Sequence, residues 1–423
     1  MLPIRANANV VVNENNPSSA RELLAYYNLE QYPKTYLFYG PQFTDQYSGE
    51  DKNNPYSDAK PKYEKDYKKG EYVIVNDYKN AIQNYNSEHA SILPRMWSTE
   101  HAENYMLYTG YLDFSIKSEY QMQNEIRSIV SDFRSRVTEG LVDYPDYHKF
   151  LKTYARYINV EKPSLVNNIA YMIEYQLGYM YWRYFMWNFT GRQDDIQGKY
   201  DLHGNWISGI TFIDEYFLGI SQDNLPSDVL HNKARNTYYF LPLILGLIGL
   251  FFLFNKDKKI FRVMLVFFLF TGLAIQVYTN VRPFEPRERD YSLVGSFYVF
   301  AMWIGFGVYA IFNAMSKISK HKLIAPAVTL VCLAAVPLIL ATNNWDDHDR
   351  SGKRTTHAMA KKYLESCAPN AILFTIGDND TFPLWYLQEI EGVRTDVRVV
   401  NTSLFQTAWY IDQMKRKAYD SDP

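Results

Sequence analysis

The chain has 423 residues and a formal net charge of −2, and aromatic residues make up 17% of it. This near-neutral charge excludes the strongly basic surface that nucleic-acid binding needs, so we expect no nucleic acid among the partners. The 2 cysteines are too few for a disulfide framework.

Residues 1–237 form a long polar arm, which we expect to be mainly helical and rich in aromatic side chains. Ser19-Ala-Arg-Glu22 has the spacing of a capping box and predicts a short helix over 19–28. Residues 44–71 hold many Asp, Lys, Asn and Pro and predict an exposed loop or hairpin. Apolar residues at helical spacing from 113 to 158 predict two or three helices.

The segment 166–189 is rich in Tyr, Trp and Met but also carries Glu174 and Arg183. We interpret it as an amphipathic helix that lies at the membrane surface. The alternative is a further membrane span, which would invert the arm that precedes it.

Four apolar runs without any Asp, Glu, Lys, Arg or His follow in the middle of the chain. Each crosses, or nearly crosses, a hydrocarbon layer of about 30 Å as a helix. They predict a four-helix transmembrane block over 238–342, and their lack of ionisable groups disfavours ion-coupled transport. The runs are 238–254, 263–279, 291–312 and 323–341.

Basic residues in the short loops predict which ends of the spans face the cytoplasm. They cluster after the first run and after the third. Because an even number of spans returns the chain to its starting side, we expect both long arms to be extracytoplasmic and the protein to lie in a cytoplasmic (inner) membrane. The clustered residues are Lys256, Lys258, Lys259, Arg262, Lys317, Lys320 and Lys322.

The start of the chain conflicts with this topology, because nothing near Met1 has the pattern of an export signal. We therefore interpret Met1 as an internal methionine of a longer protein with further spans upstream. The alternative is a true start at Met1.

After the last run, residues 343–423 alternate between helix and strand patterns, which predicts a small extracytoplasmic α/β domain with a parallel sheet. The pattern stops abruptly at Pro423, which leaves open that the domain is incomplete. The predicted helices are 353–367, 383–391 and 408–417, and the predicted strands are 371–376 and 397–400.

The loop between the second and third runs is the first of three stretches that could carry chemistry. Arg282, Arg287 and Arg289 are candidates for binding the phosphate of a lipid-linked donor, because guanidinium pairs bidentately with phosphate. The alternative is pairing within the loop, as between a glutamate and an arginine four residues later. The candidate acid–base residues are Glu285, Glu288 and Asp290.

Gly377-Asp-Asn-Asp-Thr-Phe-Pro383 is the second stretch, between a predicted strand and a predicted helix, where open α/β sheets bind ligands. Asp378 and Asp380 could hold a divalent metal through their oxygens. The alternative is a turn and helix cap, with Pro383 at the first helical position.

Trp345-Asp-Asp-His-Asp-Arg350 is the third stretch, and Asp346, His348 and Asp349 are its candidate metal ligands. It fails as a calcium loop, because Ala358 stands where the closing glutamate is needed. The alternative is a solvated acidic loop that begins a helix.

Six strings in the chain resemble a bacterial family of multi-span envelope proteins that was long described as a domain of unknown function. That family resembles protein O-mannosyltransferases, including the eukaryotic enzyme that mannosylates plexin-type receptor domains. The similarity covers essentially the whole chain. The strings are Ile4-Arg-Ala-Asn-Ala-Asn9, Asn13-Glu-Asn-Asn-Pro17, Gln176-Leu-Gly-Tyr-Met-Tyr-Trp-Arg-Tyr-Phe-Met-Trp-Asn-Phe189, Pro283-Phe-Glu-Pro-Arg-Glu-Arg-Asp-Tyr291, Asp346-Asp-His-Asp-Arg350 and Gly377-Asp-Asn-Asp-Thr-Phe-Pro-Leu-Trp-Tyr386.

The resemblance implies a C-type glycosyltransferase that moves a sugar, with mannose as one candidate, from a polyprenyl phosphate to a protein hydroxyl on the extracytoplasmic face. In such enzymes the acidic catalytic residue lies in the first extracytoplasmic loop, and no residue of this chain matches it. The chain resembles the middle and later part of the family only, so we expect it to be inactive by itself.

The expected partners are therefore the lipid bilayer, a polyprenyl-phosphate sugar donor and an acceptor protein, with a divalent metal as a candidate cofactor. The alternative is a non-catalytic envelope module that binds protein or glycan partners through its aromatic arms.

Overall fold

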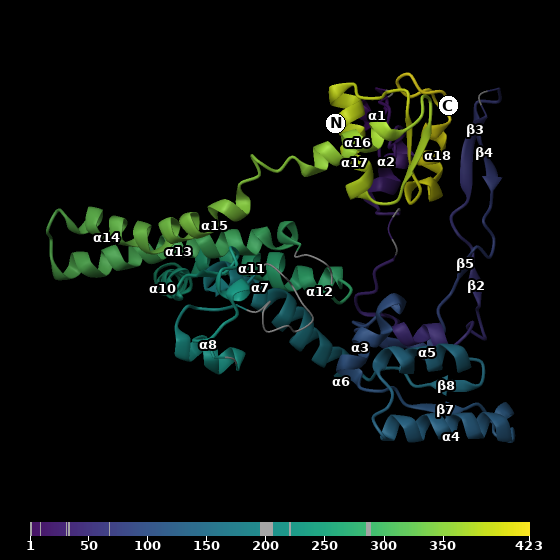
Figure 1. Cartoon of the computed structure of the whole chain (residues 1–423), viewed down its shortest axis with the longest axis horizontal. Helices are drawn as coiled ribbons and strands as arrows, with labels where there is room; N and C mark the ends of the chain where they lie inside the picture. Colours follow the sequence, from purple (N-terminus) through teal and green to yellow (C-terminus); the bar gives the residue numbers. More distant parts are fainter. Residues whose placement is uncertain are drawn as a thin grey trace. The chain divides into compact units, whose positions relative to one another are not determined.

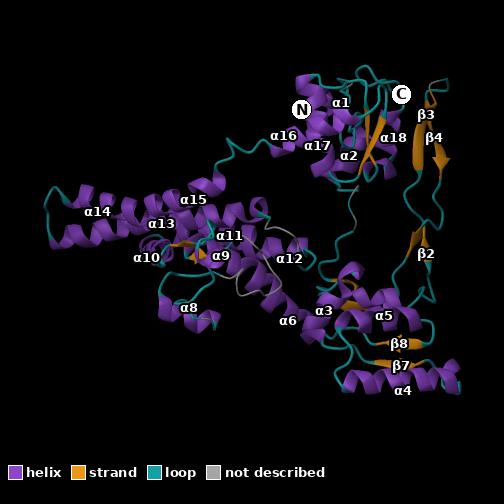
Figure 2. Cartoon of the chain, in the orientation of Figure 1, coloured by secondary structure: helices purple, strands orange, loops and turns teal. Residues whose placement is uncertain are grey.

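The computed structural model of the chain describes residues 2–8, 10–30, 32, 34–66, 68–194, 206–219, 221–284 and 289–423. Helices dominate it, and its sheets are small and two-stranded (Figure 2). The chain divides into a smaller unit, Met1–Lys34 with His348–Pro423, and a larger unit, Thr35–Asp347. This division differs from the predicted boundaries at 237 and 342, because the first residues of the chain fold with the last.

The smaller unit has the predicted α/β character, and its strands β11 and β12 pair in parallel, with Leu373 opposite Val399. The predicted capping box of α2 is also confirmed, since the Ser19 side chain accepts from the Glu22 N–H. The elements are α1 (Leu2–Ala6), α2 (Ala20–Tyr27), α16 (Thr355–Ser366), β11 (Ile372–Thr375), α17 (Asp378–Glu391), β12 (Arg398–Asn401), the 3-10 turn η9 (Leu404–Gln406) and α18 (Ala408–Met414).

Helix α17 begins earlier than predicted, at Asp378, with Gly377 as its extended N-cap. The predicted turn with Pro383 at the first helical position is therefore wrong, and Pro383 lies inside the helix. The Thr381 hydroxyl holds the first turn, because it donates to the Gly377 carbonyl over 2.8 Å. Both predicted metal-ligand carboxylates lie in this first turn, where the helix dipole favours negative charge.

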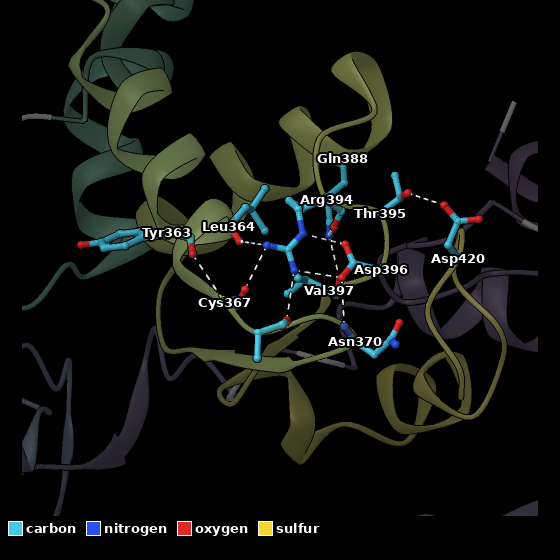
Figure 3. A network of polar contacts seen from close by, with 11 residues as sticks. Tyr363, Leu364, Cys367, Asn370, Gln388, Arg394, Thr395, Asp396, Val397 and Asp420 are labelled. Carbon is cyan, nitrogen blue, oxygen red and sulfur yellow. Dashed lines mark hydrogen bonds and ion pairs between the residues drawn. The ribbon is translucent and has the colours of Figure 1, made fainter.

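Arg394 joins the end of helix α16 to the loop before β12 (Figure 3). Its guanidinium pairs bidentately with Asp396, at 2.8 and 2.9 Å, and also donates to the carbonyls of Leu364 and Cys367 at 2.9 and 3.0 Å. Asp396 further accepts from the Asn370 N–H at 2.9 Å. These contacts hold the pKa of the Asp396 carboxyl well below its ordinary value.

The larger unit begins with an aromatic core. The prediction of helices between 113 and 158 is confirmed by α4 and α5, which pack with α3 and the unpredicted strands β7 and β8 around buried rings such as Phe133 and Tyr147. The elements are β1 (Tyr39–Pro41), β6 (Ala90–Ile92), α3 (Ala102–Thr109), β7 (Phe114–Ile116), α4 (Asn124–Thr138), α5 (Tyr144–Tyr154), β8 (Ile158–Val160) and the 3-10 turns η1 (Phe43–Tyr47), η2 (Ser87–His89), η3 (Thr99–His101) and η4 (Ser118–Tyr120).

A hairpin with two successive strand pairs includes much of the segment 44–71, which the sequence predicted to be exposed. Strands β3 (Lys62–Asp66) and β4 (Glu71–Asn76) pair antiparallel, and β2 (Tyr56–Ser57) pairs with β5 (Ile82–Gln83). The side chains of β4 are mostly exposed, so the hairpin interpretation of this segment is confirmed.

A continuous helical stretch, 165–189, links this aromatic core to the apolar helices, and we call it the aromatic helix. It consists of α6 (Leu165–Ala170), the π-helical segment η5 (Tyr171–Arg183) and α7 (Tyr184–Phe189). Its first part contributes Tyr171 and Tyr175 to the aromatic core, and its last part contributes Phe185 and Phe189 to a second core with the apolar helices. The predicted helix is confirmed, while its place at the membrane surface stays a prediction.

Short elements connect the aromatic helix to the apolar helices. The Arg192 guanidinium forms an ion pair with the Asp347 carboxylate. This contact joins the segment directly after the aromatic helix to the end of the last apolar helix. The short elements are β9 (Gly191–Arg192), α8 (Thr211–Leu218), α9 (Ser227–Leu230) and β10 (Asn236–Thr237), and β9 pairs with β10.

Three helical stretches among the described residues are long and apolar enough to cross a membrane: Lys258–Thr279, Asp290–Ile318 and Ile324–His348. The first predicted run, 238–254, forms a shorter apolar helix, Leu241–Lys256. It starts late because Tyr239 and Phe240 have left-handed φ angles of 51° and 59°.

These stretches and the shorter helix have eight named parts, of which Figure 1 labels the α-helices. They are α10 (Leu241–Lys256), α11 (Lys258–Leu269), the π-helical η7 (Phe270–Ala274), α12 (Ile275–Thr279), α13 (Asp290–Ile318), α14 (Ile324–Leu333), the π-helical η8 (Ala334–Leu338) and α15 (Ile339–His348). The last stretch runs through Trp345 to His348, so the acidic segment ends a helix rather than beginning one, which corrects the prediction.

Helices α10 and α13 approach closely through glycines. A Cβ atom on Gly249 would lie 1.8 Å from the Trp303 carbonyl oxygen, and one on Gly307 would lie 2.1 Å from the Leu245 carbonyl oxygen. Small residues at such crossings let apolar helices pack in a bilayer, where the hydrophobic effect does not drive their association.

We predict that Gly249→Ala destabilises this packing by about 1–3 kcal/mol, because the obstructing atoms belong to the backbone and cannot rotate away. Thermal unfolding of the purified protein in detergent measures the loss. Gly305→Ala is the matched control, since its Cβ would meet nothing within 4 Å and alanine favours helix. Equal stability of the two variants would contradict the close approach.

We also predict that acid lowers the folding stability of the smaller unit. The depressed pKa of Asp396 means that the unfolded chain, with an ordinary Asp pKa of about 3.9, binds this proton more readily than the folded chain. The stabilisation is complete above that pH and is lost as pH falls toward the lower folded pKa. The protection of the β12 amides from hydrogen exchange, measured relative to their intrinsic exchange rate at each pH, should therefore decrease below about pH 4.

Asp396→Asn should remove part of this pH dependence, because an amide does not titrate. Asp412→Asn is the control, since Asp412 forms an exposed ion pair with Lys415 at 3.1 Å. An unchanged exchange profile for Asp396→Asn would contradict the assignment.

Candidate functional site

The loop at 281–290, which we call the arginine loop, begins where α12 ends at Asn280. Asn280 adopts a left-handed φ of 44°, which asparagine tolerates better than most residues. Its side-chain oxygen accepts from Gln176 at 2.7 Å, and its backbone carbonyl accepts from the Trp97 indole at 2.7 Å. The start of the loop is therefore fixed to the aromatic helix and to the segment before α3.

Arg95 lies beneath this junction and is fully buried. Its guanidinium donates to the Val277 carbonyl, in the last turn of α12, at 2.5 Å and to the Leu37 carbonyl at 3.0 Å. A cation at the C-terminus of a helix is favourable, and it satisfies a carbonyl that has no partner within the helix. Burial lowers the pKa of Arg95 from its high ordinary value.

The sequence analysis missed Arg95. The available signal was its setting in Ile92-Leu-Pro-Arg-Met-Trp97, where one charge stands among apolar residues. Charged residues are rarely buried without partners, so an arginine in such a run indicates a specific structural contact.

Two tyrosines of the aromatic helix hold the arginine loop at separate points. The Phe284 N–H donates to the Tyr175 hydroxyl at 2.6 Å, and the two rings meet edge to face at 5.5 Å. The Tyr184 hydroxyl donates to the Asp290 carboxylate, at the start of α13. Asp290, a candidate acid–base residue, is thus part of the support for the loop.

Arg183 lies between these two tyrosines in sequence and is buried. Its guanidinium carbon is 4.4 Å from the ring centres of both Tyr179 and Trp187, and its Nε donates to the Tyr179 carbonyl at 3.0 Å. Such cation–π contacts stabilise a desolvated guanidinium.

The structure describes some of the predicted loop residues and not others. Arg282 lies 3.4 Å from Glu100, and both side chains are largely exposed, so this ion pair is weak and easily exchanged. Arg289 directly precedes α13. Glu285, Arg287 and Glu288 lie outside the described residues, and so does the predicted pairing of Glu285 with Arg289.

No group of three or more His, Cys, Asp or Glu side chains that could hold a metal ion occurs within the described ranges. Asp346 accepts from the Asp347 N–H at 3.1 Å, and Asp349 accepts from the Ser351 N–H at 2.9 Å. Hydrogen bonds from the Ser351 side chain and from its N–H lower the pKa of the Asp349 carboxyl. The structure therefore does not assemble Asp346, His348 and Asp349 into a metal site, and Asp378 with Asp380 remains a pair of carboxylates on one helical turn.

Two segments of the chain match known protein families. Residues 356–423 match the family described as TMEM260-associated domain 2, and residues 33–173 match a family of unknown function, DUF8416. The first match covers the α/β part of the smaller unit, and the second covers the hairpin, the aromatic core and the start of the aromatic helix. No curated protein and no solved structure matches the chain.

We predict that the double change Tyr175→Phe and Tyr184→Phe releases the arginine loop, because it removes a hydroxyl bond on each side. Each bond is worth about 1 kcal/mol, so the loss of both should let the loop open about 30-fold more often. Trypsin cleavage after Arg289 reports this opening, whereas Arg282 is protected from trypsin by the following Pro283.

Tyr291→Phe serves as the control, since Tyr291 is exposed and is adjacent to the loop in sequence. If the double variant and the control are cleaved at the same rate, the two hydroxyls do not hold the loop.

Proposed function

We propose that this chain is part of a membrane glycosyltransferase-like protein that transfers a sugar, in the simplest case mannose, from a polyprenyl-phosphate donor to protein hydroxyls. The observation that carries the proposal is the arginine loop, held at Phe284 and Asp290 beside the ends of two apolar helices. The resemblance of Pro283–Tyr291 and Gln176–Phe189 to the O-mannosyltransferase-like family supports it, since these strings form the loop and the helix that holds it.

The loop offers what a lipid-linked phosphate requires. Arg282 and Arg289 stand on either side of Phe284, and Arg287 lies between them in sequence. A guanidinium binds two phosphate oxygens at once, and the exposed Glu100 competes only weakly for Arg282. The polyprenyl chain of the donor would lie among the apolar helices, and its phosphate would then reach the loop.

In the proposed reaction, the acceptor hydroxyl oxygen attacks the anomeric carbon of the sugar and loses its proton to a carboxylate. The bond from the anomeric carbon to the phosphate oxygen breaks, and the leaving polyprenyl phosphate keeps the bonding electrons. The arginines stabilise the charge that develops on the phosphate. The resemblance matches no residue of this chain to that carboxylate, and Asp290 helps to hold the loop through Tyr184 in this proposal.

The proposed topology includes α10 as a fourth membrane helix, so that the two arms, residues 1–237 and 343–423, lie on the extracytoplasmic side of the inner membrane. Lys256 ends α10, and Lys258 and Lys259 begin α11, at the opposite end of the helix Lys258–Thr279 from the arginine loop. Lys317 and Lys320 lie at the corresponding end of Asp290–Ile318. This arrangement follows the preference for basic residues on the cytoplasmic side.

We predict that Arg287→Ala and Arg289→Ala lower sugar transfer by the full-length protein about 10- to 1,000-fold, because each removes a charge-assisted contact to the leaving phosphate. Transfer of radiolabelled mannose from polyprenyl-phosphate mannose to an acceptor peptide measures the effect. Arg262→Ala is the matched control, since Arg262 is exposed at the other end of Lys258–Thr279.

Unchanged transfer by both loop variants, with expression and folding intact, would exclude the loop as the phosphate site. Absence of transfer by the unaltered full-length protein with any polyprenyl-phosphate sugar would favour the non-catalytic envelope module instead.

A further inference from the structure

The smaller unit contains a cavity of about 610 Å³ that the proposed sugar transfer does not use. It lies where the N-terminal segment packs against α17, and its volume is in the range of small-molecule sites, roughly 300–1,000 Å³. Three strings that carry the family resemblance line it together. Arg5 comes from the first string, Glu14 from the second and Tyr386 from the last, although they are far apart in the sequence.

The wall formed by the N-terminal segment is fixed to the rest of the unit. The buried Gln413 side chain, on α18, accepts from the Asn13 N–H and donates to the Asn13 carbonyl, both at 2.8 Å. Asn15 and Asn16 then turn the chain with left-handed φ angles of 57° and 37°. Because the N–H and the carbonyl of Asn13 are both hydrogen-bonded to Gln413, this segment forms a fixed wall of the cavity.

Helix α17 supplies the opposite wall with one face of its surface. Phe382, Trp385, Tyr386 and Glu389 are spaced three and four residues apart, so they lie on the same side of the helix. The rings of Phe382 and Trp385 stack at a centroid distance of 5.5 Å, and Tyr386 is half-exposed. Tyr419 lines the cavity as well, and its hydroxyl donates to Glu389.

The charged groups of the cavity define the chemistry of its ligand. Within the described part of the chain, the exposed side chains of Arg5 and Glu14 form neither a hydrogen bond nor an ion pair. Arginine only donates hydrogen bonds and a carboxylate only accepts them, so a ligand that satisfies both must accept and donate. Hydroxyl groups do both.

Other ligand classes fit less well. Glu14 and Glu389 together outweigh Arg5, which disfavours an anion such as a phosphate. An apolar chain would desolvate the charged groups without replacing their hydrogen bonds. A peptide bound as an extended strand needs a free sheet edge, whereas this wall is a helix face.

We propose that this cavity is a carbohydrate-binding site for a neutral saccharide, with the rings of Trp385 and Tyr386 against the apolar face of a sugar and Arg5 and Glu14 bound to its hydroxyls. Aromatic rings cover the C–H face of a sugar while polar groups around them select its hydroxyls. The inference does not depend on the proposed sugar transfer, because none of these residues belongs to the arginine loop.

The test uses the full chain in lipid nanodiscs, because common maltoside detergents carry sugar headgroups. Saturation-transfer NMR with mannotriose, maltotriose and cellotriose as probes should show binding of at least one of them. Tyr386→Ala should weaken this binding about three- to tenfold, the loss expected for one aromatic contact. Glu14→Gln should weaken it without changing the shape of the cavity.

Tyr363→Ala is the matched control, because Tyr363 lies in the same unit, outside the cavity, and is 49% exposed compared with 50% for Tyr386. Its saccharide binding should equal that of the unaltered chain. No binding of any probe at about 10 mM, or equal binding by the Tyr386 and Tyr363 variants, would overturn the proposal. Binding of an unstructured peptide at these residues, without saccharide binding, would assign the cavity to polypeptide and overturn it as well.

Discussion

A buried guanidinium joins the apolar helices of this protein to its aromatic core. Arg95 donates to a carbonyl in the last turn of α12, while its own backbone N–H is held by Asn168 at 2.8 Å, on the aromatic helix. A charge in such a place is tolerated only when several acceptors surround it. The end of α12, the left-handed Asn280 and the start of the arginine loop all depend on this contact.

The aromatic helix also connects the aromatic core to the apolar helices, along the length of the larger unit. Its first half belongs to the aromatic core and its second half to the core of the apolar helices, so neither core can shift without moving the helix. Tyr175 and Tyr184, from the two halves, hold the arginine loop. The loop is therefore positioned by the same element that joins the cores, which makes its geometry a property of the whole unit.

Periodic patterns in the sequence predicted the regular elements well, and long-range partners explain where the prediction failed. The parallel pair β11 and β12, helices α4 and α5 and the capped α2 follow from local periodicity and capping residues. The early start of α17 does not, because Thr381 is held by Asn401 from β12 at 2.8 Å as well as by Gly377. Similarly, Tyr238 and Arg192 bind Asn344 and Asp347 and extend the last apolar helix beyond its apolar run.

Helix α10 has 16 residues, whereas its neighbour α13 has 29. At about 1.5 Å per residue, the two helices are about 24 and 44 Å long, and they are held side by side by glycines. A bilayer core of about 30 Å cannot match both lengths. In the four-span topology proposed above, the lipid beside α10 would become thinner or α13 would tilt, so hydrophobic mismatch would make the protein sensitive to the thickness of its membrane.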